Sequence, residues 1–300
     1  MFKGSFVALI TPFRDGKVDD EAFQAFVQWQ IDQGTHGVVP CGTTGESPTL
    51  SHSEHRRVTE LCLEVAKGKV PVIAGTGSNS TEEAISLTHH AKKAGVDAVL
   101  SVTPYYNKPT QEGLYQHFKA IHDAVDIPMV IYNIPGRSVV DMSVETMARL
   151  AKLANVVGVK DATGDLGRPA RTRLVIGPDF CQLSGDDATV VAFLAQGGHG
   201  CISVAADIAP KQCARLHEAW QAGDLATVWE IRDRLMPLHD ALFVETSPAP
   251  VKYAVSLLGR CSPEVRLPLC EVSGKTKEKV RAAMISAGLL SEESGRPAAA

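Results

Sequence analysis

The chain repeats one pattern, in which a short apolar run is followed by a turn bearing glycine or threonine and then by an amphipathic helical stretch. Strands that alternate with helices in this way form a parallel sheet, because each helix carries the chain back to the start of the next strand. Eight such runs favour closure of the sheet into a (β/α)8 barrel. The predicted strands are Ser5–Ile10, Gly37–Pro40, Pro71–Ala74, Ala98–Val102, Met129–Tyr132, Val156–Lys160, Cys181–Ser184 and Gly200–Ser203.

Helical stretches fill the intervals between the predicted strands. Asp20 and Thr81 are typical of helix N-caps, and Gly34, Gly68 and Gly95 are typical of helix ends. These signals predict separate helices of ordinary length. Four of them span Asp20–Gln33, Ser51–Ala66, Thr81–Ala94 and Gln111–Val125.

A doubly wound open sheet is the alternative to a barrel. Such a sheet is expected to carry a glycine fingerprint after its first strand, where this chain reads Thr11-Pro12-Phe13. From about Pro210 the chain reads as helix only, so it exceeds a bare barrel. We therefore expect a barrel over residues 1–224 and a C-terminal helical domain over 225–300, with a frayed tail from Ser294 to Ala300. The helices expected there span Lys211–Ala222, Leu225–Leu242, Pro248–Leu258 and Lys275–Ala287.

The composition excludes several classes of partner. The net charge is -4 and no block of basic residues occurs, so we expect no nucleic-acid partner. We expect no membrane association and a cytoplasmic location, because no apolar run approaches a membrane span and the first residues lack the apolar core of a signal peptide. Seven scattered cysteines without a Cys-x-x-Cys pair predict buried free thiols, and neither disulfides nor a metal site.

Two residues at strand ends indicate covalent chemistry. In a (β/α)8 barrel the active site lies at the carboxyl ends of the strands, and there Lys160 closes one apolar run while Tyr132 closes the preceding one. Burial favours the neutral form of an amine, which is the form that attacks a carbonyl. A tyrosine is able to move the proton that imine formation requires. An ion pair between Lys160 and Asp161 is disfavoured, since neighbouring strand residues face opposite sides. The pair predicts a Schiff-base enzyme.

Two further loops at the expected rim carry groups that suit a carboxylate. Gly42-Thr43-Thr44-Gly45 follows the second predicted strand, and its backbone N–H groups and hydroxyls are suited to an anion. Arg137 follows the fifth strand and is suited to a two-pronged contact with a carboxylate. Each loop alone is also compatible with a plain turn, so the prediction depends on their occurrence together.

Three motifs stand at the ends of these strands. They are Gly42-Thr43-Thr44-Gly45-Glu46, Tyr132-Asn133-x-Pro135-x-Arg137 and Gly158-x-Lys160-x-Ala162-Thr163. Together they resemble the signatures of the dihydrodipicolinate synthase / N-acetylneuraminate lyase superfamily, and the resemblance extends from the first strand to at least Leu258. It implies a homotetrameric barrel, a dimer of dimers with a C-terminal helical domain. It further implies a lyase that condenses pyruvate with L-aspartate 4-semialdehyde on the route to diaminopimelate and lysine.

The resemblance implies roles for the catalytic residues. Lys160 would form a covalent imine with pyruvate, so neither a metal nor an organic cofactor is expected. Tyr132, Thr43 and Tyr106 match a proton relay in which Tyr106 reaches in from a neighbouring subunit. Without the resemblance, Tyr106 would be interpreted equally well as part of a packed aromatic pair.

The resemblance also implies roles in substrate binding. Thr44, with Thr43, would hold the carboxylate of pyruvate, and Arg137 would hold that of the semialdehyde. The backbone carbonyl of Ile202 would lie against the pocket. One position departs from the family pattern, because Ser138 stands where the family has threonine.

A second set of residues matches positions that bind the inhibitor lysine in sensitive family members. Glu83 suits an ammonium group, and His52 and His55 lie three apart on one helical face. A solvated helix with two ordinary histidines is the alternative. The set comprises Ser47, His52, His55, Asn79, Glu83 and Tyr105.

Two alternatives to this function stay open. A class I aldolase of the same superfamily, acting on a 2-keto-3-deoxy sugar acid or a hydroxy-oxoacid, would use the same lysine and tyrosine. Arg137 and Thr44 favour the synthase over such an aldolase. A non-catalytic barrel that binds a keto acid as a sensor is the second alternative, and it would not need the complete relay of Thr43, Tyr132 and Lys160.

Overall fold

The structure is a computed structural model that describes residues 1–291 and 297. Its main sheet has eight strands in the order β4-β1-β10-β9-β8-β7-β6-β5, so the first strand is the neighbour of the last. A sheet wound in two directions from its centre does not give this order, whereas a (β/α)8 barrel does. All eight predicted strands and the predicted fold class are confirmed. The strands are β1 (Gly4–Ala8), β4 (Gly37–Val39), β5 (Ile73–Gly75), β6 (Ala98–Val102), β7 (Met129–Asn133), β8 (Val156–Asp161), β9 (Cys181–Ser184) and β10 (Gly200–Ser203).

By its internal contacts the chain divides into two compact units. The first comprises residues 1–4 and 71–202, and the second comprises residues 5–70 and those from 203 onward. This division does not test the expected domain boundary near residue 224, which stays a prediction.

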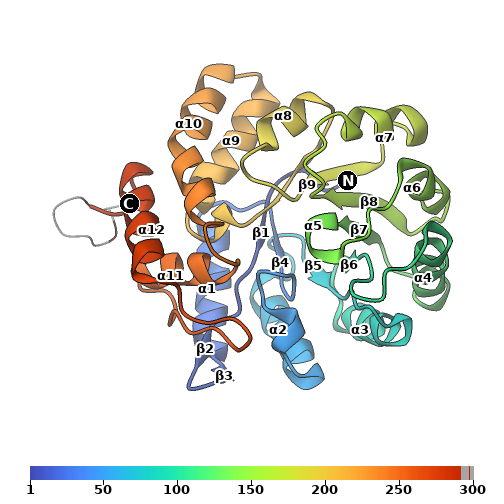
Figure 1. The fold of residues 1–300 in the computed structure, drawn as a ribbon, viewed down its shortest axis with the longest axis horizontal. Coiled ribbons are helices and arrows are strands. Elements are labelled where there is room, and N and C mark those ends of the chain that lie inside the picture. Colours follow the sequence, from blue (N-terminus) through green and yellow to red (C-terminus); the bar gives the residue numbers. More distant parts are fainter. Residues whose placement is uncertain (292–296, 298–300) are drawn as a thin grey trace. The chain divides into compact units, whose positions relative to one another are not determined.

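In the first unit the strands from β5 to β10 pair in parallel, each with the next along the chain. Helices α3, α4 and α6 lie along the outer side of β6, β7 and β8, as the green part of Figure 1 shows. Buried strands read as apolar runs because both of their faces are covered. The helices are α3 (Thr81–Ala94), α4 (Gln111–Ala124), α5 (Pro135–Ser138), α6 (Val144–Leu150), α7 (Arg168–Ile176) and α8 (Val190–Ala195).

In the second unit β1 pairs in parallel with β4, and α1 packs against α2. The C-terminal helices pack on one another: α10 packs against α9 and α12, and α12 also packs against α11 (Figure 1). All four helices predicted from Pro210 onward are confirmed. The elements are α1 (Asp20–Asp32), α2 (His52–Ala66), α9 (Pro210–Ala222), α10 (Leu225–Ala241), α11 (Ala249–Leu257), α12 (Gly274–Ser286), the hairpin β2 (Phe13–Arg14) and β3 (Lys17–Val18), and the 3-10 turns η1 (Ser47–Thr49) and η2 (Ala205–Asp207).

Two helix starts differ by one residue from the prediction. The N-caps are Asp19 and Ser80, whose side chains accept hydrogen bonds from backbone N–H groups of α1 and α3. Asp20 and Thr81 are instead the first helical residues. A cap lies outside the helix, and two adjacent residues of capping type cannot be told apart by pattern alone. Gly95 ends α3 with φ 96°, as predicted.

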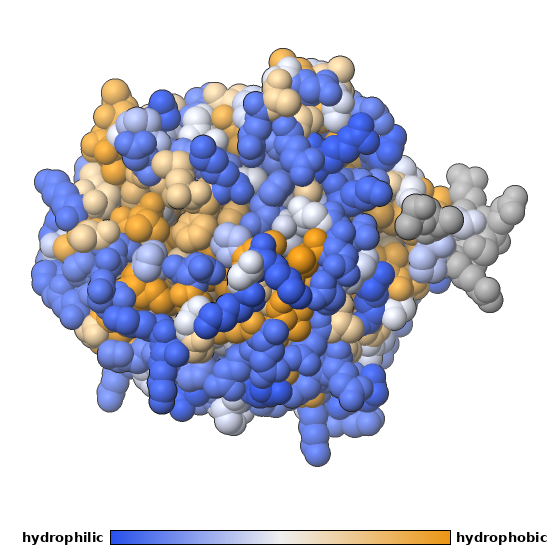
Figure 2. Space-filling model, turned by 180° about the vertical axis from the view of Figure 1, so that it is seen from behind, coloured by the Kyte–Doolittle hydropathy of each residue, from blue (hydrophilic) through white to orange (hydrophobic). Residues whose placement is uncertain are grey.

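Among the described residues, no helix has both the length and the apolar character of a membrane span. The face in Figure 2 is largely hydrophilic, with apolar areas between the polar ones. All seven cysteines are free; five are buried, Cys261 is half-buried, and Cys270 is exposed, so the prediction of burial is wrong for Cys270. The predicted fraying of Ser294–Ala300 concerns residues outside the described part, apart from Pro297.

One glycine of β8 is required by close packing on the next strand. A Cβ atom on Gly158 would lie 2.4 Å from the carbonyl oxygen of Cys181 and 2.7 Å from its Cβ. Backbone atoms cannot move away as a flexible side chain can. Gly158 therefore sets how closely β8 approaches β9, two residues before Lys160.

We expect Gly158→Ala to lower the free energy of unfolding by about 2 kcal/mol, because overpacking displaces β8 from β9. Gly274→Ala is the control, since nothing lies within 4 Å of a Cβ on Gly274 and the residue begins a helix. Its free energy of unfolding should stay within about 0.5 kcal/mol of the wild type. Urea denaturation measures both, and equal stabilities of the two variants would contradict this account of β8.

Candidate active site

Lys160 and Tyr132 lie side by side at the ends of adjacent strands. The register of β7 and β8 pairs them directly, and both side chains are only 6% exposed. The ammonium nitrogen of Lys160 lies 4.3 Å from the centroid of the Tyr132 ring. No carboxylate that the structure describes pairs with Lys160. A buried amine beside a phenol is the arrangement expected for imine formation with proton transfer.

A glycine leaves room for the lysine side chain. A Cβ atom on Gly185, just after β9, would lie 3.1 Å from Cε of Lys160 and 2.8 Å from Cβ of Ala162. The backbone N–H of Gly185 donates to the carbonyl oxygen of Asp161 at 2.7 Å. The loop after β9 is therefore attached to the end of β8, and its lack of a side chain keeps the Lys160 stem unobstructed.

Asp161 faces away from Lys160 and is held by an arginine of α7. Oδ2 of Asp161 lies 3.4 Å from Nε of Arg168, and Oδ1 accepts from the backbone N–H and the hydroxyl of Thr163. Both partners of this ion pair are buried. Burial raises the pKa of Asp161, while Thr163 and then Arg168 act in the opposite direction. The expectation that Asp161 would not pair with Lys160 is confirmed.

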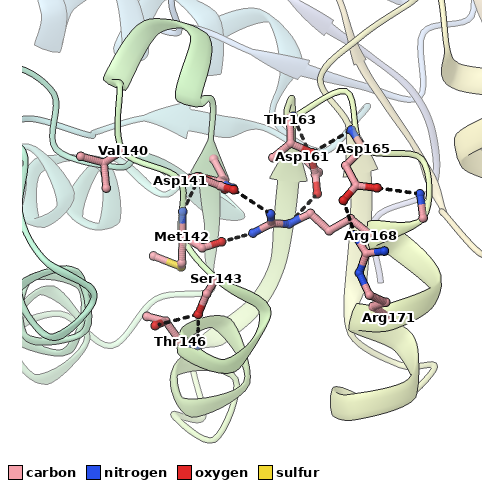
Figure 3. Close-up of polar contacts among 12 residues, drawn as sticks. Val140, Asp141, Met142, Ser143, Thr146, Asp161, Thr163, Asp165, Arg168 and Arg171 are labelled. Atoms are coloured by element: carbon pink, nitrogen blue, oxygen red, sulfur yellow. Dashed lines mark hydrogen bonds and ion pairs between the residues drawn. The ribbon is translucent and has the colours of Figure 1, made fainter.

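The same arginine joins the end of β8 to the segment that follows β7. Its guanidinium group extends between Asp161 and Asp141 and also donates to the carbonyl oxygen of Met142 (Figure 3). Asp141 in turn accepts from the side-chain amide of Asn133 at 2.7 Å, and Asn133 is the residue after Tyr132. One buried arginine thus fixes the end of β7, which carries Tyr132, and the end of β8, which carries Lys160.

Arg137 lies on the short helix α5, which begins directly after β7. Its side chain is exposed, whereas the neighbouring Ser138 is buried. The hydroxyl of Ser138 accepts from Thr103 at 3.1 Å and lies 2.9 Å from the carbonyl oxygen of Ile134. Serine therefore supplies the hydroxyl contacts of this turn at the position where the family has threonine.

The threonine loop is a strained turn with a residue in the left-handed region at each end. Cys41 has φ 56° and Glu46 has φ 54°, which is uncommon for residues other than glycine. Thr44 is buried and Thr43 is half-buried. The hydroxyl of Thr11 donates to the carbonyl oxygen of Gly45 at 2.7 Å. Such strain persists only where the surroundings fix the backbone, and it is concentrated at functional sites.

The remaining predicted site residues have contrasting environments. Tyr106 is 89% exposed and has φ 72°, so it projects from the surface in a strained conformation. Ile202 is buried on β10. Neither observation tests the role that was predicted for the residue.

Three of the residues predicted to bind lysine lie together in the first unit. Tyr105 forms a hydrogen bond with the backbone of Asn79, and its pKa is raised by burial and then by the charge of Glu83. Glu83 also accepts from the hydroxyl of Ser78. In the second unit His55 is buried on α2, His52 is exposed at the start of that helix, and Ser47 begins η1. The two histidines therefore do not share a solvated face.

Two charged residues that matter to the site were missed by sequence analysis. Arg168 and Lys252 are both buried, and each neutralises a carboxylate beside a predicted site residue. Lys252 had a detectable signal, because it is the only charged residue in the apolar run Ala249–Val255. Arg168 had none, since it stands beside two other arginines, Arg171 and Arg173, in residues 168–173. Among the described residues no group of three or more histidine, cysteine, aspartate or glutamate side chains is arranged to hold a metal ion.

Comparison with known proteins places this site in a family. The model of the dihydrodipicolinate synthetase family matches residues 1–287. A 4-hydroxy-tetrahydrodipicolinate synthase of Rhodospirillum centenum is 72% identical over 290 residues, which cover 97% of this chain and 100% of the relative. The chain belongs to the dihydrodipicolinate synthetase family.

Solved structures agree with this assignment. The dihydrodipicolinate synthase of Acinetobacter baumannii, solved in complex with pyruvate, is 45% identical with a TM-score of 0.94 and covers 97% of this chain and 100% of its own. The enzyme of Cyanidioschyzon merolae, solved with lysine bound, is 41% identical with a TM-score of 0.93 and covers 96% and 99%. The predicted family and fold are confirmed.

We expect Arg168→Met to lower the free energy of unfolding by about 3 kcal/mol at neutral pH, because it leaves a buried carboxylate without its cation. The loss should shrink as the pH falls, since protonation of Asp161 removes the unpaired charge and its pKa is already raised by burial. Urea denaturation at several pH values measures both effects.

The control for this change lies on the same helix. Arg171 pairs with Asp165, but both side chains are about half exposed, so Arg171→Met should change the free energy of unfolding by less than about 0.5 kcal/mol. Equal losses in the two variants, or a loss in Arg168→Met that does not depend on pH, would contradict the buried network.

Proposed function

We propose that this protein condenses pyruvate with L-aspartate 4-semialdehyde to give 4-hydroxy-tetrahydrodipicolinate, the product for which its relative at 72% identity is named. The observation that carries the proposal is the buried pair of Lys160 and Tyr132 at adjacent strand ends. The reaction supplies a precursor of diaminopimelate and lysine.

The chemistry follows from the residue types. The neutral amine of Lys160 attacks the ketone carbon of pyruvate, and water leaves as the imine forms. Tyr132, with Thr43 and Tyr106, carries the protons that these steps exchange. The imine makes the methyl protons acidic, and the resulting enamine attacks the aldehyde carbon of the second substrate. The amino group of the condensed semialdehyde then attacks the imine carbon and displaces the amine of Lys160, which closes the ring of the product and restores the lysine, so the cycle needs no metal or organic cofactor.

Substrate carboxylates are held by the two loops described above. In this proposal Thr43 and Thr44 bind the carboxylate of pyruvate, Arg137 binds that of the semialdehyde, and the carbonyl oxygen of Ile202 lines the pocket. The exposure of Arg137 suits a group that meets a substrate arriving from solvent. Its planar guanidinium matches a carboxylate in a two-pronged fashion.

The assembly proposed for this protein is a cytoplasmic homotetramer built as a dimer of dimers. The support is Tyr106, a large aromatic side chain that is 89% exposed and held in a strained backbone conformation. A strained conformation persists where it serves a function, and contact with a neighbouring subunit would give this tyrosine one. The C-terminal helical domain from residue 225 belongs to the same proposal.

Turnover and trapping together test the reaction. Wild type should convert both substrates and, after borohydride reduction with pyruvate, should gain the mass of one reduced pyruvate on Lys160. Arg137→Ala should lose turnover but keep the trapped adduct, because only the second substrate loses its partner. Lys160→Met should lose both. Trapping in wild type without turnover of the semialdehyde would indicate another pyruvate-dependent aldolase, and no trapping would indicate a keto-acid sensor.

We further propose that lysine inhibits this enzyme as a feedback regulator. The carboxylate of Glu83 and the hydroxyl of Tyr105 form an acceptor-rich cluster suited to an ammonium group. Ser47, His52, His55 and Asn79 complete the proposed set. A family member solved with lysine bound supports the ligand class.

Glu83→Gln tests this regulation, because it removes the charge that attracts the lysine ammonium group and keeps the side chain's shape. Millimolar lysine should slow the initial rate of the wild type, and the variant should need at least about tenfold more lysine for the same effect. The exposed Glu82 on the same helix provides the control variant Glu82→Gln. If millimolar lysine left the initial rate of the wild type unchanged, the proposal would be ruled out.

A further inference from the structure

The strained threonine loop is attached to the C-terminal helices by a buried ion pair. Nζ of Lys252 on α11 lies 2.7 Å from Oε1 of Glu46, and their side chains are 0% and 1% exposed. Nζ of Lys252 also lies 4.0 Å from the centroid of the buried Phe13 ring. Both charged groups of the pair are therefore shielded from solvent.

The second carboxylate oxygen of Glu46 also has a hydrogen-bond partner. Oε2 accepts from the backbone N–H of Arg266 at 3.1 Å. The Arg266 side chain donates to the carbonyl oxygen of Thr49 and makes a two-pronged contact with Glu54. The segment after α11 therefore holds the loop at Glu46 and again at Thr49, three residues later.

This attachment acts on a backbone that would not otherwise keep its shape. The left-handed conformation of Glu46 is unfavourable for a residue with a side chain. Its N–H donates to the carbonyl oxygen of Thr43 at 3.1 Å, which closes a turn over Thr44 and Gly45. Fixing the Glu46 side chain therefore fixes the turn that presents Thr43 and Thr44.

A contribution to stability alone does not explain the pair. Removing two charges from water costs about as much free energy as their attraction returns, so buried ion pairs contribute little net stability. Burial lowers the pKa of Lys252, and Glu46 opposes this shift. What the fully buried, directional contact between Lys252 and Glu46 does supply is a fixed geometry of the loop.

We propose that Lys252 is a positioning residue for the pyruvate carboxylate: through Glu46 it holds the turn that presents Thr43 and Thr44. The proposal rests on the proposed function of that loop. It assigns the C-terminal helices a part in binding one substrate only, the keto acid. The semialdehyde, which Arg137 binds, does not depend on this contact.

Three variants test the proposal. Lys252→Met removes the cation and keeps an apolar stem of similar length. Lys252→Met with Glu46→Gln removes both charges, so no unpaired charge is left buried, and the glutamine oxygen is still able to accept from the N–H of Arg266. Lys277→Met is the control, because Lys277 on α12 pairs with Glu271 at the surface, where the two side chains are 37% and 67% exposed.

The Michaelis constants of the two substrates are then measured separately. In Lys252→Met and in the double variant we expect KM for pyruvate to rise about tenfold and KM for the semialdehyde to stay within about twofold, since a misplaced loop costs binding of its own ligand. Amide hydrogen exchange should quicken at Glu46. The control should match the wild type in every readout.

A double variant that is as stable as the wild type and keeps its KM for pyruvate would overturn the proposal. A wild type that traps no pyruvate would overturn the proposed function, and the inference with it. A rise of both Michaelis constants by the same factor would also contradict the proposal, because it would reveal a general loss of structure.

Discussion

The alternation of side chains along β7 and β8 separates the proposed reacting groups from the groups that hold them in place. Tyr132 is opposite Lys160, and one residue further on Asn133 is opposite Asp161. Since neighbouring residues face opposite sides of a strand, the polar network of Asp161 does not compete for the amine of Lys160. Arg168 neutralises that network and joins it to the segment after β7 (Figure 3). The proposed chemistry of the site depends on this division.

The two buried ion pairs follow one principle. Arg168 neutralises Asp161, the residue after the proposed nucleophile, and Lys252 neutralises Glu46, two residues after the proposed carboxylate-binding Thr44. Each pair joins a strand end or loop of the proposed site to a helix within the same compact unit. Because such pairs add little net stability, fixed geometry is the property that explains them best.

Much of this structure could be predicted from the sequence. Apolar runs locate all eight strands, because buried parallel strands leave a plain hydrophobic signal. The environments of Lys160 and Thr44 follow from their positions at strand ends. The exact N-caps could not be predicted, since Asp19 and Asp20 are equivalent in the sequence. The pairs of Arg168 and Lys252 were also out of reach, because partners 7 and 206 residues apart meet only in the folded chain.

A crystal structure of the pyruvate-loaded enzyme tests the central claim most directly. We predict continuous density from Nζ of Lys160 to the second carbon of pyruvate, with the pyruvate carboxylate on the hydroxyl and N–H groups of Thr43 and Thr44. Density that joins pyruvate to another lysine, or a carboxylate bound by Arg137 in place of the threonine loop, would contradict the account.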